Sequence, residues 1–272
     1  MATGMEREWL EARIDDAISK QERGDLAHLS FLTPRDARRA EQYLRMRGVW
    51  EQAWLWGGYP NAEYTALFLL PAYLSDCLPF PPMECSPNDI LEMLGEDVED
   101  VVSAVRITGS GFRTLSHRDY LGAILHLGLE RSALGDLAVQ NEKEAILFCP
   151  KKFIPFLQEH LQRVASDAVR ISPYVMAEDF TDGKKYQPIS DTVASERLDC
   201  VVATLCNLSR EGAQDAIRSG LVEVDFELNE RVDTTLVAPT TITVRGYGRF
   251  ILRAFLGKTQ KGRIRLRADK MI

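Results

Sequence analysis

Apolar residues recur at helical spacing near the start of the chain, and short strand-like runs follow them. The apolar residues that share one side of the first predicted helix are Trp9, Ile14 and Ile18. Pro34 suits the first position of a second helix, which runs through Arg47. Two strand-like runs, 53–57 and 66–71, follow with a turn of glycine, proline and asparagine between them. We predict an N-terminal helical and β region over residues 1–81.

A regular order of strand and helix patterns follows the proline-rich segment that closes this region. The predicted elements are a strand (104–108), a helix (117–127), two strands (136–140 and 144–148), a helix (152–164) and a strand (168–172). Ser116 and Asp119 have capping-box spacing at the first helix. The order βαββαβ is that of the split-βαβ, ferredoxin-like fold shared by RNA-recognition motifs (RRMs), and we place this domain at 86–178. It lacks the aromatic pattern with which RRMs stack bases, so its topology alone predicts no RNA contact.

The last part of the chain begins after a polar segment, 179–193, which is predicted to be a linker. The next apolar residues share one helix face and are Leu198, Val201, Val202 and Leu205. Ser209 can cap a second helix, which ends at Gly220, and a strand over 221–225 follows. The pattern predicts a helix-turn-helix-strand unit in a domain at 194–272, and the whole chain belongs to the α+β class.

Charge is distributed unevenly along the chain. The net charge is -7, but residues 241–272 hold nine Lys or Arg against one acid, which leaves -15 for the rest. A basic segment on an acidic body indicates one defined surface for a polyanion. Within it, Arg263, Arg265 and Arg267 alternate with apolar residues, so a strand would place them on one face about 6.6 Å apart, near the spacing of RNA phosphates. The alternative is a solvated edge strand whose charge prevents aggregation.

Other chemistry is poorly represented. The five cysteines form no C-x-x-C pair and are predicted to be reduced thiols, and the four histidines lack metal-ligand spacing. We therefore expect no cofactor and no metal. No stretch reaches the roughly 18 apolar residues of a membrane span, and we expect a cytoplasmic protein. Tyr247, in RGYGR, can either stack on a base or pack in a tight turn.

The spacing of the C-terminal residues resembles the signature of the S4, or αL-type, RNA-binding family. The matching residues are Arg197-Leu198-Asp199, Ser209-Arg210, Ala213, Ile217, Gly220, Val222 and Val224. Two positions depart from the signature: Asp225 stands where the family has Asn, and Pro239-Thr240 replaces a Gly-Asp turn. The acid at 225 weakens the expectation of a phosphate contact at that position.

Further motifs are similar to those of the YlmH-like S4 proteins, which include cyanobacterial and plastid relatives linked to photosystem II. They are Phe31-Leu32-Thr33-Pro34-Arg35, Leu115, His117-Arg118-Asp119, Leu121-Gly122, Gly135-Asp136, Arg245-Gly246-Tyr247-Gly248-Arg249, Lys258-Thr259 and Lys261. This resemblance implies a non-enzymatic protein that binds ribosomal RNA of the large subunit and, in some members, tRNA during quality control of stalled translation. The oligomeric state is not predicted.

The predicted RNA contacts combine the S4-type helices with the basic tail. They are Arg197, Ser209, Arg210, Gln214, Arg218, Arg245, Tyr247, Arg249, Lys258, Lys261, Arg263, Arg265 and Arg267. Arg197 and Arg210 are expected on the surface, so that alanine at both would leave thermal stability nearly unchanged. Two other functions stay open: a photosystem II-linked or other assembly factor, and an RNA-modifying enzyme.

Overall fold

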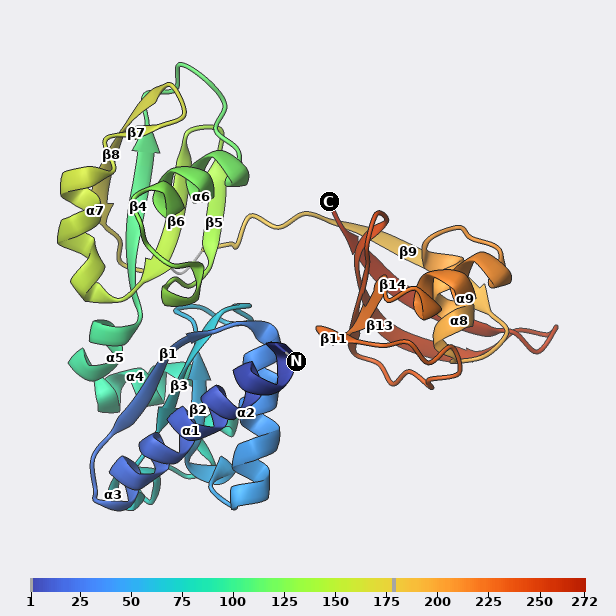
Figure 1. Cartoon of the computed structure of the whole chain (residues 1–272), viewed down its shortest axis with the longest axis horizontal. Helices are drawn as coiled ribbons and strands as arrows, with labels where there is room; N and C mark the ends of the chain where they lie inside the picture. Colours follow the sequence, from blue (N-terminus) through green and yellow to red (C-terminus); the bar gives the residue numbers. More distant parts are fainter. Residues whose placement is uncertain (1, 178–179) are drawn as a thin grey trace. The chain divides into compact units, whose positions relative to one another are not determined.

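The computed structural model describes residues 2–177 and 180–272, which form two compact units, 1–183 and 184–272 (Figure 1). In unit 1 the N-terminal elements are α1 (Ala2–Glu22), β1 (Ala27–Leu32), α2 (Pro34–Arg47), β2 (Ala53–Trp56), β3 (Thr65–Leu69), α3 (Ala72–Ser75), α4 (Pro87–Leu94) and α5 (Glu96–Val101). The strands form an antiparallel sheet in the order β1-β3-β2. Strand β1 was not predicted, although its sequence AHLSFL alternates apolar and polar residues over its first five positions.

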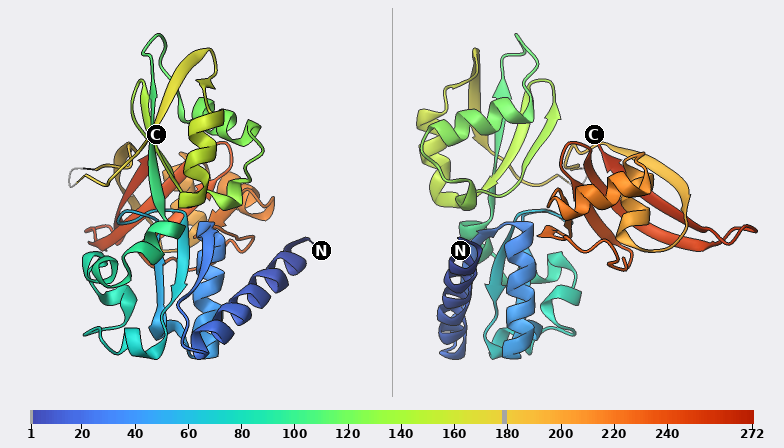
Figure 2. Two further views of the ribbon diagram at one scale, coloured as in Figure 1. Left: turned by 90° about the vertical axis from the view of Figure 1, so that its left-hand side faces the viewer. Right: turned by 45° about the vertical axis from the view of Figure 1, so that its right-hand side comes forward.

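The second half of unit 1 contains the predicted βαββαβ order. Its elements are β4 (Ser103–Gly109), α6 (His117–His126), β5 (Leu137–Asn141), β6 (Glu144–Cys149), α7 (Ile154–His160), β7 (Arg163–Val164) and β8 (Asp167–Pro173). The strand order is β5-β6-β4-β8-β7, all antiparallel, so β4 lies between β6 and β8. Helix α6 has the predicted capping box of Ser116 and Asp119. Figure 2 shows α6 and α7 on the same side of this sheet.

The predicted helix over 152–164 was too long. Helix α7 ends at His160, and Arg163–Val164 turn back to pair with Ala168–Asp167 of β8. The apolar residues Leu161 and Val164, which extended the helical pattern, instead fill the core between the helices and the sheet. The three-residue spacing of these two apolar positions fits a continued helix, and it fits equally well a helix end followed by a short strand.

Unit 1 has a hydrophobic core that joins its two sheets. Phe31, Trp54 and Tyr59 from the N-terminal half pack with Ile146 and Phe148 from the β6 face that points away from α6 and α7. Gly135 is required here, because a Cβ would lie 2.5 Å from the Phe31 ring and 2.9 Å from Phe148 Cβ. The proline-rich segment near residue 81 therefore does not separate two independent cores.

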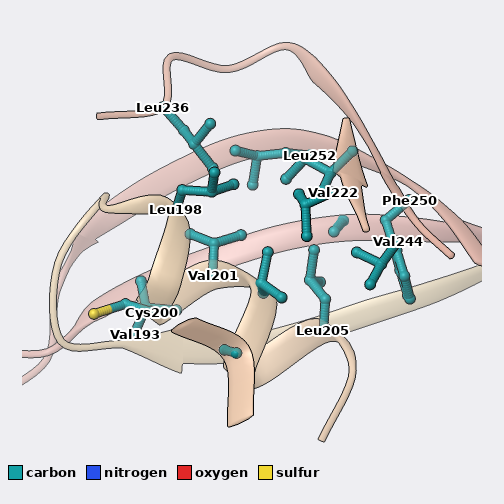
Figure 3. Packing of buried hydrophobic residues seen from close by; sticks show 14 of the residues in the cluster. Val193, Leu198, Cys200, Val201, Leu205, Val222, Leu236, Val244, Phe250 and Leu252 are labelled. Carbon is teal, nitrogen blue, oxygen red and sulfur yellow. The ribbon is translucent and has the colours of Figure 1, made fainter. Parts of the chain in front are cut away.

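Unit 2 consists of two helices on one face of a curved sheet. Its elements are β9 (Tyr186–Val193), α8 (Leu198–Leu205), α9 (Arg210–Arg218), β10 (Val222–Val224), β11 (Glu227–Leu228), β12 (Thr240–Val244), β13 (Gly248–Lys258) and β14 (Ile264–Met271). The strand order is β11-β10-β12-β13-β14-β9. Leu198, Val201 and Leu205 of α8 meet Val244 and Phe250 of the sheet (Figure 3).

Much of the predicted linker is a strand. Residues 186–193 form β9, which pairs antiparallel with β14 along its whole length. Its polar sequence YQPISDTV fits this place, because β9 is an edge strand exposed along most of its length, and an edge tolerates Pro188. Because β9 is mostly exposed, its sequence contains few apolar residues, and this polar composition led to the prediction of a linker.

Candidate RNA interface

A buried carboxylate organises the helix-turn-helix of unit 2. Asp199 lies in the first turn of α8 and is 0% exposed. Arg197 donates to it from Nε (3.1 Å) and Nη2 (3.2 Å), and Arg210 donates from Nε (3.1 Å). Gln214 completes the shell with Nε2 at 2.9 Å from Oδ2. Asp199 therefore ties the start of α8 to the first two turns of α9.

This arrangement corrects the expectation for Arg197 and Arg210. Their side chains are 38% and 60% exposed, so both present guanidinium surface to solvent. At the same time, both neutralise a carboxylate that solvent does not reach, and alanine at these positions would leave it with an amide alone. The sequence-based prediction gave Asp199 no role. Its position at a helix start between the apolar residues Leu198 and Cys200, which are buried, could have indicated a buried carboxylate.

Acidification is expected to destabilise unit 2 below about pH 4. Although burial alone would raise it, the hydrogen bonds from Arg197, Gln214 and Arg210 hold the pKa of Asp199 well below its ordinary value. A depressed folded-state pKa stabilises the fold above the unfolded value of about 3.9, and the stabilisation is lost as pH falls below it. Hydrogen exchange of the α8 amides, corrected for intrinsic rates, should show this loss, and Asp199→Asn should show less pH dependence.

The remaining predicted helix residues have mainly local roles. Ser209 caps α9 by accepting from Gly212 N at 3.0 Å, so its hydroxyl serves the helix start. Arg218 is 59% exposed and lies 3.9 Å from Asp215. Asp225 is a turn residue: it and Phe226 have positive φ between β10 and β11, and its Oδ1 accepts from Thr241 N at 2.8 Å. Aspartate and asparagine are both suited to the positive φ of such a turn, so Asp225 can stand where the S4 signature has asparagine.

The basic tail lies on the other face of the sheet. In β14 Leu266 and Ala268 are buried under the helices, while Arg265 and Arg267 alternate with them and are exposed. They lie opposite Thr192 and Ser190 of β9, whereas Arg263, just before the strand, donates from Nε to Thr192 Oγ1 at 2.8 Å. Alternation in β14 is as predicted. The single surface predicted from helices and tail is divided between two faces of unit 2.

The other predicted contacts lie in the hairpin turns. Arg245 and Tyr247, which is 40% exposed, belong to the turn between β12 and β13, where Gly246 and Gly248 have positive φ. The guanidinium carbon of Arg249 lies 5.3 Å from the Phe226 ring centroid. Lys258 and Lys261 are exposed near the β13–β14 turn. These residues lie at the two ends of β13, apart from the helix starts that carry Arg197 and Arg210.

The sheet of the central domain is covered on the face that RRMs use for RNA. Tyr174 and Phe180 close over it, with the Phe180 ring 5.8 Å from Phe148 and 6.4 Å from Tyr174. Arg106 lies over Tyr174 at 4.9 Å. Phe148 is 1% exposed, so it cannot stack on a base in this conformation.

Reactive groups are not prominent in the part of the chain that the structure describes. Burial raises the pKa of the Cys149 thiol to about 12, which makes it a poor nucleophile. Among the described residues no three His, Cys, Asp or Glu side chains come together as a metal site would need. None of the described helices combines the length and the apolar character needed to cross a membrane.

Comparison with known proteins assigns the central domain. Residues 99–178 match the protein family described as "Putative RNA-binding domain in YlmH". The chain is 27% identical over 214 residues to "Ribosome-associated protein quality control protein P2" of Bacillus subtilis (strain 168), covering 79% of this chain and 76% of that protein. The structure of "Cell division protein ylmH from Streptococcus pneumoniae" aligns with a TM-score of 0.48 at 17% identity, over 65% of this chain and 95% of that one.

These matches indicate RNA binding for the central domain, whereas the sequence had predicted RNA contacts only in the C-terminal quarter. The central topology was predicted, but the missing aromatic pattern gave no reason to expect RNA binding there. Residues 99–178 match the RNA-binding domain family of YlmH, and the chain is similar over most of its length to the Bacillus subtilis ribosome-associated quality control protein.

Proposed function

We propose that this chain binds structured ribosomal RNA of the large subunit through unit 2, acting as an S4-type module without catalytic activity. The observation that carries the proposal is the basic character of 241–272, whose Arg265 and Arg267 are exposed side by side on the open sheet face. Guanidinium groups are suited to phosphate contacts. The name of the Bacillus subtilis relative, with its association with ribosomes, supports the same role.

The helix face of unit 2 supplies the second element of this proposal. Arg197 and Arg210 are held by Asp199 yet present guanidinium surface beside the N-terminus of α9. A carboxylate that fixes two guanidinium groups reduces the entropy they lose on meeting a phosphate. An RNA that contacts both faces would have to wrap around the edge of the module, so the two faces are expected to contribute separately.

Arg265→Ala with Arg267→Ala is expected to weaken binding to large-subunit ribosomal RNA at least about tenfold without lowering the melting temperature, because both side chains are exposed. The logarithm of the binding constant should fall linearly with the logarithm of salt concentration, and its slope should decrease by about 1.4–1.8 in magnitude for two lost phosphate contacts. Filter binding at several salt concentrations measures both quantities.

The matched control for this experiment is Arg231→Ala with Lys184→Ala, which removes two charges from the same unit outside the predicted residues. Its binding should stay within about twofold of the unmodified protein. A binding constant that does not change with salt would contradict the proposal and favour a protein-interaction or assembly role, for which phosphate contacts are not needed.

A further inference from the structure

A groove on the helix side of the central domain lies between α6 and the segment that joins α7 to β8. Its volume is about 480 Å³, and its lining includes Arg118 and His126 of α6, His160 at the end of α7 and Arg163 of β7. The two arginines are exposed, and His160 is 46% exposed. Four nitrogen-bearing side chains thus line the rim of one depression.

The acidic groups near this groove are already engaged. Asp119, the carboxylate in the lining, accepts from Ser116 N at 2.9 Å and Ser116 Oγ at 2.6 Å in the capping box. Arg113 lies 3.9 Å from its other oxygen. Glu159 lies 3.8 Å from His160. Among the described residues neither rim arginine forms an ion pair with these acids, although the Ser116 hydrogen bonds, helped by Arg118, lower the pKa of Asp119. The guanidinium of Arg163 donates to Ser166 O at 3.1 Å.

Gly122 lies between Arg118 and His126 on the groove side of α6, since the three are spaced four residues apart. Glycine inside a helix is less favourable than alanine. A Cβ at Gly122 would meet no atom within 4 Å, so packing within the described chain does not require glycine there. The absence of a side chain at Gly122 leaves space on the groove floor between Arg118 and His126.

We propose that this groove binds the phosphate backbone of the RNA. The inference rests on the proposed function and places a second contact in unit 1. The sheet face of the domain is covered by Tyr174, Phe180 and the N-terminal half, which leaves the helix side for a ligand. Arg118 and Arg163 contact phosphates from opposite walls, and the open space at Gly122 admits the sugar-phosphate chain between them.

Two variants of the full-length chain test the groove with large-subunit ribosomal RNA as the probe. Arg118→Glu with Arg163→Glu reverses two charges, and Gly122→Gln fills the groove without changing charge. We expect the first to weaken binding at least about tenfold and the second about threefold or more. Gly122→Gln should not lower the melting temperature, because glutamine is the better helix former. Loss of affinity with retained stability separates occlusion from unfolding.

The matched control is Arg23→Glu with Arg170→Glu, which makes the same charge change at exposed positions of unit 1 away from the groove. It should bind within about twofold to threefold of the unmodified protein. If both groove variants bind like this control while the Arg265 and Arg267 variant loses affinity, the groove inference is wrong and the proposed function stands. If the unmodified chain does not bind this RNA, both are wrong.

Discussion

Alanine at both Arg197 and Arg210 is expected to lower the free energy of unfolding of unit 2 by about 3 kcal/mol, the lower end of the range for breaking a buried ion pair. Asp199 is fully buried and would keep only the Gln214 amide as a side-chain donor. The value lies at the lower end because both guanidinium groups are partly exposed, so water can reach the space they vacate. Hydrogen exchange of peptides from α8 and α9 measures the change within unit 2.

A third substitution distinguishes this cause from a simple loss of packing. Adding Asp199→Asn to the double variant removes the uncompensated charge, so the triple variant should recover part of the lost stability. Arg218→Ala, on the same helix and 59% exposed, is the matched control and should change stability by less than about 0.5 kcal/mol. If the triple variant is no more stable than the double variant, the buried carboxylate is not the reason for the loss.

RNA binding by this double variant cannot be interpreted without the stability measurement. Arg197 and Arg210 are both supports of the fold and candidate phosphate contacts, so their loss can reduce affinity in two ways. Arg265 and Arg267 have no such double role, because they alternate with the buried residues of β14 and lie outside its core. They are the better positions at which to test binding alone.

The elements that sequence patterns predicted best are those with a distinct apolar pattern or a cap. Strand β4 is marked by alternation, β6 by a continuous apolar run and helix α6 by a capping box, and all three were placed to within about two residues. Strand β9 was missed for the opposite reason: its residues are mostly polar and exposed, and only pairing with β14 makes it a strand. Such pairing depends on residues more than 70 positions away, which local patterns do not register.

The sequence named the arginines of the tail and the helices as candidate RNA contacts one by one, and their role stays a prediction. Their distribution over two faces of unit 2 depends on the register between β13, β14 and β9, which local sequence does not fix. Asp199 was matched to the S4 signature but was given no role, because an acid in the first turn of a helix is commonly only a favourable charge near the helix dipole. Its burial follows from α9 folding over it, which is a tertiary effect.

Asp136 connects the two halves of unit 1 in a similar manner. Its Oδ2 accepts from the Tyr59 hydroxyl and from Glu63 N (2.8 Å), and its Oδ1 accepts from Tyr64 N (3.2 Å). Burial, and then the Asp136 carboxylate, raise the pKa of Tyr59 far above that of an ordinary phenol, so its hydroxyl remains a donor. The Gly135-Asp136 motif thus has a structural role: glycine allows the close approach, and the acid holds the turn that contains Tyr64.

Asp136→Ala is expected to lower the free energy of unfolding of unit 1 by about 3–5 kcal/mol, because three donors lose their acceptor in a largely buried place and each costs about 1–3 kcal/mol. Asp136→Asn keeps a carbonyl acceptor and should lose less, and Tyr59→Phe, which removes one donor with its partner retained, about 1 kcal/mol. Urea unfolding followed by tryptophan fluorescence measures this, since Trp54 and Trp56 stack in the same core.

The control for this series is Glu142→Ala, an exposed acid in the neighbouring hairpin that should leave the urea midpoint within error of the unmodified protein. Because Asp136 bridges the β2–β3 turn and the start of β5, its loss should loosen the whole core shared by the two sheets and not one sheet alone. Asp136→Ala unfolding at the same urea concentration as Glu142→Ala would contradict this role and would leave the shared apolar core to hold the two sheets together.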